Sequence, residues 1–445
     1  MKRVIIIGGG ISGLASGVFL SEAGYDVRIY ESCNHLGGRA YSFTDRDFKY
    51  TLDNGQHILM GCYQYTLDYL KKIGSFQHLD IENNLNVSFR SIDKTDFTLR
   101  CNNLPAPLHI FHGLKKIEFV SIKDLFRFFI FGINIYFYRF LKKREGSAKQ
   151  FLQNLNQREE IIKKVWEPIA VSVFNSKSAE IPAQLFIDTI YEMFFKYNRF
   201  SNFILPSSSL ENIFVLPAEK YIVSNRGKIF LNKKISKFNI VENRMVSVET
   251  AKGEKIEGDI FILSIPLNSL LRIVGADKII NEDHSRVAHH EVFKNFRYSP
   301  IIAGYILLNE KIMDNKFQFF LGSNIQVLFD KTEICNLDPD KQLLSFVVSA
   351  ADDLINKSRK ELETLFLSEL FSLFPSLSSK NILFCKIIKQ KEATLLLDGI
   401  ANNNRMSTKT KIDNIFFVGD WIATGLPATI ESAVKSAYLL KKYLF

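Results

Sequence analysis

The hydrophobic pattern at the N-terminus predicts a strand, a helix and a second strand in succession. Residues 3–7 form a continuous apolar run of the kind found in strands that are buried on both faces. A helical stretch follows from Ser12 to about Ala23, and Gly24 supplies a typical helix C-cap. Residues 27–30 form the next apolar run. This order predicts a βαβ unit and therefore a parallel sheet.

The C-terminal region repeats the alternation. Residues 415–418 form a short apolar run, and after a loop a helical stretch extends from about residue 429 to 444. Between Leu216 and Pro266, apolar runs separated by turns predict several short strands, the last of them at 260–263. Strands are therefore expected at both ends and in the middle of the chain.

The most apolar stretch, Leu125 to Leu141, has two interpretations. Its two arginines bracket only eleven uncharged residues, whereas a membrane-spanning helix needs about twenty. The stretch predicts either a buried helix or a helix on a membrane surface, where phenylalanines would enter the lipid and basic side chains would reach anionic head groups. These phenylalanines are Phe128, Phe129 and Phe131, and the basic residues are Arg127, Arg139, Lys142, Lys143 and Arg144.

Composition describes an ordinary globular protein. Of the 445 residues, 47% are hydrophobic and 23% are charged, which excludes a disordered chain, and a mean hydropathy of +0.01 argues against a polytopic membrane protein. The net charge of +10 suits anionic partners, but the basic residues are scattered, which argues against nucleic-acid binding. The five cysteines lie far apart without metal-ligand spacing. We therefore expect reduced thiols, no metal site and a cytoplasmic protein, with attachment to the inner face of the cell membrane as an option.

A glycine motif between the first two strands is the first candidate site. Gly8, Gly10 and Gly13 form GxGxxG. In such a motif the first glycine permits a tight turn, the second lets the backbone approach a pyrophosphate, and the third allows close helix–strand packing. The helix that starts at Ser12 offers free N–H groups to an anion. Glu31 follows Gly13 by 18 residues, close to the separation expected for a carboxylate that binds an adenosine ribose. We predict dinucleotide binding rather than a chance glycine turn.

A second motif, Gly37-Gly38-Arg39, begins six residues after Glu31. A glycine pair alone is an ordinary turn, but an arginine directly behind it can pair with phosphate. A dehydrogenase that uses only nicotinamide has no need for this element. Together with Gly419-Asp420 near the C-terminus, it resembles the extended fingerprint of FAD proteins in the amine oxidase and phytoene desaturase superfamily.

This resemblance implies roles in FAD binding for several residues. Asp420 would hold the ribityl chain, the backbone of Ile235 would lie beside the adenine, and Gly55 would pass close to the flavin ring. The N-terminus of the last helix, at Ile430, would face the flavin pyrimidine, where about half a positive charge stabilises a reduced, anionic flavin. The expected cofactor-binding residues are Gly8, Gly10, Ser12, Gly13, Glu31, Gly38, Arg39, Gly55, Ile235, Gly419, Asp420 and Ile430.

Longer strings narrow the resemblance. They are DNGQH at 53–57, WEP at 166–168, SIP at 264–266 and GDWIATGLPATIE at 419–431. Together they resemble the squalene-associated FAD-dependent desaturases, now understood as hydroxysqualene dehydroxylases. The last string is long and unusual, so it is far more specific than GxGxxG.

The family implies an α/β fold. A Rossmann-type FAD-binding domain would be discontinuous, assembled from 1–75, 216–270 and 395–445, and an inserted α+β substrate-binding domain would comprise 76–215 and 271–394. The inserted segments are rich in phenylalanine. This enrichment predicts either ordinary core or the lining of a long apolar cavity for a hydrocarbon substrate.

The activity implied by the family is reduction of hydroxysqualene, a long-chain isoprenoid, to squalene in hopanoid synthesis. Loss of the hydroxyl as water would leave an allylic cation, which reduced flavin would quench with hydride. His57 is our candidate for the proton donor, because it follows the flavin-approaching segment and histidine titrates near neutrality. A structural hydrogen bond of His57, for example to Asp53, is the alternative. Asp53 is expected to fix a loop and Glu431 to cap the last helix. The electron donor that reduces FAD stays open.

Two other functions compete with this one. A carotenoid desaturase of the phytoene type would remove hydride from its substrate, and the strings at 53–57 and 419–431 favour the dehydroxylase over it. A non-catalytic isoprenoid-binding protein of the same fold is the second rival. The intact glycine–arginine motif at 37–39 and the Gly419-Asp420 pair argue against that reading.

Overall fold

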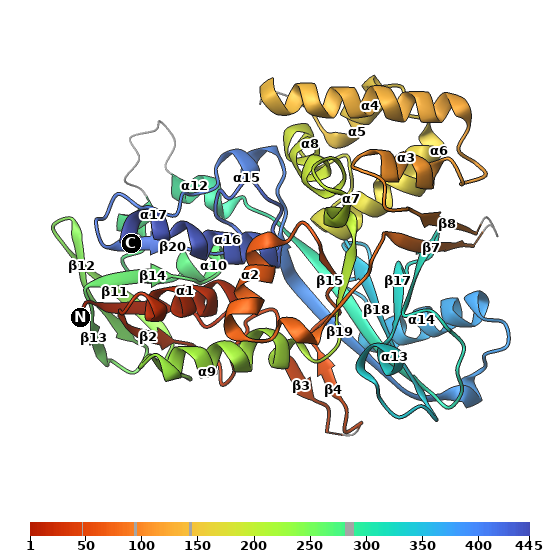
Figure 1. The fold of residues 1–445 in the computed structure, drawn as a ribbon. Helices are drawn as coiled ribbons and strands as arrows, with labels where there is room; N and C mark the ends of the chain where they lie inside the picture. The colour runs from red at the N-terminus through yellow and green to blue at the C-terminus, as the bar shows by residue number, and fades with distance from the viewer. Residues whose placement is uncertain (47, 93–95, 142–144, 281–288) are drawn as a thin grey trace.

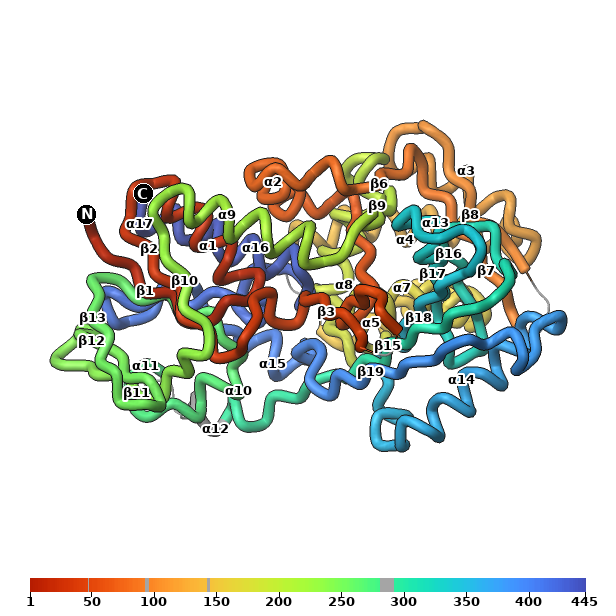
Figure 2. The backbone as a smooth tube through the Cα atoms, turned by 90° about the horizontal axis from the view of Figure 1, so that it is seen from below, coloured from red at the N-terminus to blue at the C-terminus, as the bar shows by residue number. Residues whose placement is uncertain are grey.

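The computed structural model describes residues 1–46, 48–92, 96–141, 145–280 and 289–445. Figure 1 shows three parts: a parallel sheet with its helices on the left, a group of helices that carries α4 on its outer side at the upper right, and a second large sheet below that group. Both chain termini lie at the end formed by the parallel sheet, as the perpendicular view also shows (Figure 2).

The parallel sheet contains five strands drawn from distant parts of the chain. Its order is β10-β2-β1-β14-β20, and every neighbouring pair is parallel. Helices α1 (Ile11–Glu22) and α16 (Ile430–Leu439) pack against each other beside it. The strands are β1 (Arg3–Ile7), β2 (Asp26–Tyr30), β10 (Lys228–Phe230), β14 (Ile260–Leu263) and β20 (Ile415–Phe417).

The middle segment differs from the sequence expectation at its start. Leu216–Ser224 is a helix, α9, rather than a strand. Pro217 fits the first helical turn, and Ala218 and Ile222, four residues apart, are both buried. The predicted strands follow as a small antiparallel sheet, β11 (Ile235–Val241), β12 (Arg244–Thr250) and β13 (Lys255–Glu257).

The second large sheet has seven strands in the order β19-β15-β18-β17-β16-β7-β8. It is antiparallel except where β16 runs parallel to β7. Helix α14 (Arg359–Leu373) packs on it against β19. The strands are β7 (Asn86–Ser91), β8 (Phe97–Arg100), β15 (Tyr298–Leu308), β16 (Phe317–Leu321), β17 (Val327–Asp330), β18 (Gln342–Ser349) and β19 (Ile382–Leu395).

The helical part and the connections complete the chain. The helical part comprises α3 (Leu108–Leu114), α4 (Ile122–Leu141), α5 (Ala148–Asn154), α6 (Glu159–Ile161), α7 (Glu167–Phe174) and α8 (Ala183–Ile190), with π-helical turns at Ile162–Trp166 and Tyr191–Phe195. The connections include β3 (Ser42–Thr44), β4 (Thr51–Asp53), β5 (Leu59–Met60), α2 (Gln64–Ile73), β6 (Leu79–Ile81), β9 (Phe203–Pro206), α10 (Leu267–Leu270), α11 (Asp277–Ile280), α12 (His289–Lys294), α13 (Lys331–Cys335), α15 (Gly399–Asn403) and α17 (Lys441–Leu444).

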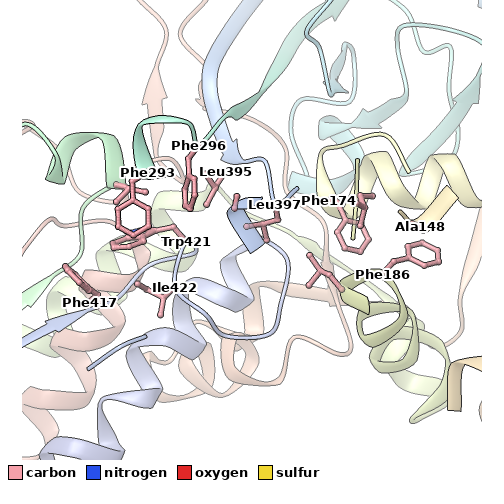
Figure 3. Packing of buried hydrophobic residues seen from close by; sticks show 14 of the residues in the cluster. Ala148, Phe174, Phe186, Phe293, Phe296, Leu395, Leu397, Phe417, Trp421 and Ile422 are labelled. Carbon is pink, nitrogen blue, oxygen red and sulfur yellow. The ribbon is translucent and has the colours of Figure 1, made fainter. Parts of the chain in front are cut away.

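One hydrophobic core continues from the parallel sheet into the helical part. Figure 3 shows Phe417, Ile422 and Trp421 at one end of this cluster and Phe174 and Phe186 at the other. Continuous burial of this kind joins the parallel sheet and the helical part, whereas the second large sheet packs around hydrophobic clusters of its own. The architecture confirms the predicted fold class: a Rossmann-type parallel α/β sheet combined with a separate mixed α+β part.

Helix α4 is neither fully buried nor fully exposed, so each of the two interpretations of its sequence describes only one of its faces. Phe128 and Phe131 are buried, whereas Phe129 is exposed. The expectation that all three would enter lipid is therefore wrong, because Phe128 and Phe131 pack on Trp166 inside the helical part. Lys142, Lys143 and Arg144 lie outside the described residues. Within the described ranges, no helix has the length and apolarity needed to cross a membrane.

Candidate functional site

The turn between β1 and α1 is packed so closely that Gly8 and Gly13 cannot carry side chains, whereas a Cβ on Gly10 would meet its nearest atom only at 4.0 Å. A Cβ on Gly8 would lie 2.3 Å from the Ser264 carbonyl oxygen, and one on Gly13 would lie 2.0 Å from the Gly8 carbonyl oxygen. The Ser12 and Ser264 hydroxyls hydrogen bond at 2.7 Å. Gly10 occupies the N-cap of α1, and in the described chain no side chain caps this helix. Its first N–H groups are therefore available to an anion.

The second glycine turn lies against the first. The Gly37 N–H donates to the Gly9 carbonyl at 2.9 Å, and a Cβ on Gly38 would lie 3.1 Å from the Gly10 Cα. Both Gly37 and Gly38 have positive φ, at 93° and 60°, which favours glycine. The two motifs thus form one continuous backbone wall.

Glu31 lies at the edge of this wall, where β2 ends. Its carboxylate accepts hydrogen bonds from the Gly9 N–H at 2.6 Å and the Cys33 N–H at 2.8 Å. The Ser32 hydroxyl also donates to this carboxylate, at 2.9 Å. The side chain is buried, but two carboxylate oxygens have about four acceptor positions, so one remains for a ligand hydroxyl. The Lys233 N–H donates to the Glu31 carbonyl at 2.8 Å, which brings the backbone just before Ile235 to the same edge.

Arg39 connects three of the predicted motifs. Its guanidinium donates to the Asp420 carboxylate at 2.7 Å and to the Ala393 carbonyl at 2.7 Å. Its own carbonyl accepts from the Asn54 side-chain amide at 3.0 Å. Asp420 follows Gly419, whose φ is 148°, and a Cβ on Gly419 would lie 2.9 Å from the Trp421 ring. Residues 37–39, 53–57 and 419–431 therefore meet at one place.

Arg405 supports this place and was missed from the sequence. It is buried, and it donates to the Leu426 carbonyl at 2.7 Å and the Asp420 carbonyl at 3.0 Å. Burial lowers its pKa to about 10, against the opposing charge of Asp420. Its Nε has no partner among the described residues. No sequence signal marks this arginine, because it lies in a polar stretch far from any motif.

Glu431 is a cap, but for a different helix from the one expected. Its carboxylate accepts from the Tyr65 N–H at 3.0 Å, the Thr66 N–H at 2.8 Å and the Thr66 hydroxyl at 2.7 Å. These groups belong to the first turn of α2. Burial raises the pKa of Glu431, while the hydrogen bonds from Thr66 oppose the shift. The start of α16, at Ile430, is thereby fixed to the start of α2.

Asp53 fixes loops, as its sequence position predicted. Its carboxylate accepts from the Ser42 hydroxyl at 2.7 Å and the Leu210 N–H at 3.0 Å. Lys331, buried and 278 positions away in the chain, lies 3.4 Å from the same carboxylate and donates to the Gln56 side chain at 2.9 Å. Lys331 was also missed, because nothing near it in the sequence indicates a partner so far away.

His57 bonds to the backbone rather than to Asp53. Its Nδ1 lies 2.9 Å from the Gly55 carbonyl oxygen, which can only accept, so the neutral ring carries its hydrogen on Nδ1. Burial lowers the pKa of His57, although the bond to Gly55 opposes the shift. Above Gly55, a Cβ would have its nearest neighbour at 3.9 Å, the Ala303 Cβ.

A crevice of about 810 Å³ opens beside the loop that follows Asp420. It lies between helices α2 and α16 and the helical part, and its walls include Tyr63, Met193, Leu426 and Glu431. The string at 166–168 does not reach this region: Trp166 packs on Phe131 at a ring distance of 4.6 Å. Ser264 and Ile265 lie instead at the glycine turn and the 419–431 loop: the Ser264 hydroxyl bonds to that of Ser12, and the Ile265 carbonyl accepts from the Trp421 indole at 3.1 Å.

These groups match the chemistry of a dinucleotide. Side-chain-free backbone and an uncapped helix N-terminus suit a pyrophosphate, the neighbouring carboxylate suits a ribose, and the guanidinium–carboxylate pair extends the site toward α16. The fold and this site define an FAD-dependent oxidoreductase.

The chain belongs to the family described as flavin containing amine oxidoreductase, whose model matches residues 11–439. It is 24% identical over 440 residues to a hydroxysqualene dehydroxylase of Zymomonas mobilis, covering 98% of this chain and 97% of that protein. It is 22% identical to a 15-cis-phytoene desaturase of Solanum lycopersicum, covering 98% and 76%. An oxidoreductase from Methanosarcina mazei has the same fold, with a TM-score of 0.75, 17% identity and coverage of 99% and 100%.

Proposed function

We propose that this protein reduces hydroxysqualene to squalene, with FAD as its redox cofactor, on the cytoplasmic side of the cell. The similarity to a hydroxysqualene dehydroxylase extends over nearly the full length of both chains, at 98% and 97%. The phytoene desaturase is matched over 76% of its length. Both relatives are named for isoprenoid substrates, which supports an isoprenoid substrate here.

One observation of the structure carries this proposal. The two strings that most resemble the dehydroxylases, at 53–57 and 419–431, are joined through Arg39, which bonds to Asn54 on one side and Asp420 on the other. This contact between separate loops supports the proposal that the resemblance concerns the cofactor site.

We assign the cofactor contacts as follows. The turns at 8–13 and 37–39 hold the pyrophosphate, Glu31 binds the adenosine ribose, and the backbone at Ile235 lies by the adenine. Asp420 holds the ribityl chain, and the N-terminus of α16 faces the flavin. Segments 1–75, 216–270 and 395–445 make up this domain, and 76–215 and 271–394 serve the substrate.

The reaction needs hydride for the carbon and a proton for the departing hydroxyl. FAD, bound and reduced, supplies the hydride. The protein must deliver the proton and exclude water. His57 is the proposed donor. Since burial lowers its pKa and Nδ1 holds the Gly55 carbonyl, it can donate from Nε2 only when the ring is protonated. This assignment requires turnover to rise as the pH falls.

A desaturase of the phytoene type is the second candidate, since the tomato relative supports it. That reaction removes hydride from the substrate and consumes oxidised FAD. The two functions differ in the direction of electron flow, so a product assay separates them.

The test is product analysis with purified holoenzyme, which is given hydroxysqualene with a chemical reductant or, separately, phytoene with an electron acceptor. We expect squalene from hydroxysqualene and no desaturated carotene from phytoene under oxidising conditions. Asp420→Asn should lose activity with its flavin, whereas Asp413→Asn, a matched change at an exposed aspartate seven residues earlier, should not. Carotene from phytoene, with hydroxysqualene unchanged, would overturn the proposal.

A further inference from the structure

Helix α4 has two apolar faces. Its inner face, with Phe128, Phe131 and Ile135, is buried against the body of the protein. A second row follows the helical period on the outside. Its members, with their exposed fractions, are Phe126 (64%), Phe129 (53%), Ile133 (51%), Phe137 (59%) and Phe140 (80%). Spacings of three and four residues place them in one stripe, which we call the α4 stripe.

The stripe is held rigidly at the outside of the molecule. Asp124, in the first turn of α4, accepts from the Ser121 hydroxyl at 2.7 Å and pairs with Arg127 at 2.9 Å and Arg158 at 3.1 Å. Near the other end, Arg139 pairs with Glu192 at 3.3 Å. Figure 1 shows α4 as the outermost element of the helical part. Nothing in the described ranges covers the stripe.

Its dimensions suit a helix lying in a membrane surface. Twenty residues at about 1.5 Å each give a rod of about 30 Å. Contiguous exposed apolar surface of this kind is rare in proteins that remain free in water.

The surrounding charge selects the partner. The described segment 115–141 contains five basic residues and two acidic ones, and one of these acids, Asp124, is buried and paired. Arg127 and Arg139 are paired with Asp124 and Glu192, so the remaining positive charge comes from Lys115, Lys116 and Lys123, which are all exposed. Basic residues around an apolar stripe complement an anionic lipid surface, where each adds to the attraction. A second copy of this basic face would repel it.

The inner face connects this surface with the interior. Phe128 and Phe131 line a wholly apolar cavity of about 50 Å³ together with Ile110, Trp166 and Phe194. This volume is well below the roughly 300 Å³ of a typical ligand pocket. The cavity is therefore too small to bind the substrate, but it shows that the interior directly behind α4 is apolar. Only the thickness of α4 separates this apolar interior from the stripe.

We propose that the α4 stripe docks the protein on an anionic lipid bilayer, with its phenylalanines in the interface and the helix parallel to the surface. The choice of a bilayer rests on the proposed function, because a squalene-type substrate dissolves in lipid rather than water. Docking through α4 brings the apolar interior next to the phase that holds the substrate.

Vesicle sedimentation tests the docking without substrate. The holoenzyme is mixed at low salt with phosphatidylcholine vesicles, with and without phosphatidylglycerol. We expect sedimentation with the anionic vesicles and at least about tenfold weaker partitioning for the double variant Phe129→Ser, Phe137→Ser. Val241→Ser with Val274→Ser is the control, since these residues are as exposed, at 58% and 64%, but lie in or beside the small sheet around β11. The control should sediment as the wild type does.

Three outcomes would overturn the docking proposal. They are equal sedimentation of the α4 variant and the wild type, equal binding to neutral and anionic vesicles, and a wild-type dimer in lipid-free solution that the α4 variant abolishes. Flavin absorbance and a thermal melt confirm that the variant is folded, as expected for exposed positions. Because no substrate is present, failure here leaves the proposed reaction standing, and failure of the product assay leaves the docking result standing.

Discussion

Replacing Arg405 with methionine removes a buried guanidinium from beneath the loop at 419–428. Two short bonds to the Leu426 and Asp420 carbonyls are lost, each worth about 1.5–3 kcal/mol for a charged donor. The variant also avoids the free-energy cost of burying the arginine's charge, which offsets part of this loss. A pKa lowered to about 10 corresponds to about 3 kcal/mol, at about 1.4 kcal/mol per pH unit. The net destabilisation is about 0–3 kcal/mol, and two carbonyls left without donors place it near the upper end.

Urea unfolding of the cofactor-free protein, followed by circular dichroism, measures this difference. FAD titration measures the second consequence, because Asp420 loses the bond that positions its backbone. We expect weaker FAD binding for Arg405→Met and partial recovery for Arg405→Lys. Arg359→Met, at an exposed position at the start of α14, is the control. Unchanged stability together with unchanged FAD affinity would refute the role given to Arg405.

Three further predictions concern single side chains. Glu31→Ala and Asp420→Ala should each weaken FAD binding by about 1–3 kcal/mol, the cost of stranded buried partners, and equal flavin retention after dilution would contradict this. His57→Phe should bind FAD normally yet turn over at least about 100-fold more slowly. In the wild type, turnover should rise as the pH falls below about 6.5, because the pKa of His57 is lowered by burial. Activity of the variant within a few-fold of wild type would show that His57 is structural. Burial lowers the pKa of His109 to about 4, so between about pH 6.5 and 4 only the unfolded chain takes up this proton. The free energy of unfolding should therefore fall by up to about 3 kcal/mol across this window, and His109→Gln should remove most of that slope in urea titrations.

The sequence correctly predicted those helices and strands whose conformation is determined by residues close to one another in the chain. The strand–glycine–helix–strand unit ending at Glu31 is determined within one short segment, so its sequence indicates both its structure and its packing. Leu216–Ser224 misled the prediction because its apolar residues fit a strand or a short helix equally well. The proline in its first turn was the available signal.

Long-range partners could not be predicted in the same way. Lys331 reaches Asp53 across 278 positions, and Arg405 reaches Asp420 only because the chain folds back. On α4, both faces are apolar, so periodicity defines the two stripes but not which one faces inward. Packing of Phe131 on Trp166 decides this, and no local rule contains that contact.

The central claim is that electrons flow from FAD to the substrate, and one anaerobic measurement tests it most directly. The FAD of the holoenzyme is reduced beforehand and mixed with hydroxysqualene in a single turnover, while the visible absorbance of oxidised flavin is recorded. We predict that this absorbance returns as squalene forms, one molecule for each flavin reoxidised. If reduced flavin stays colourless with hydroxysqualene, and oxidised flavin is instead bleached by phytoene, the protein is a desaturase and the account is wrong.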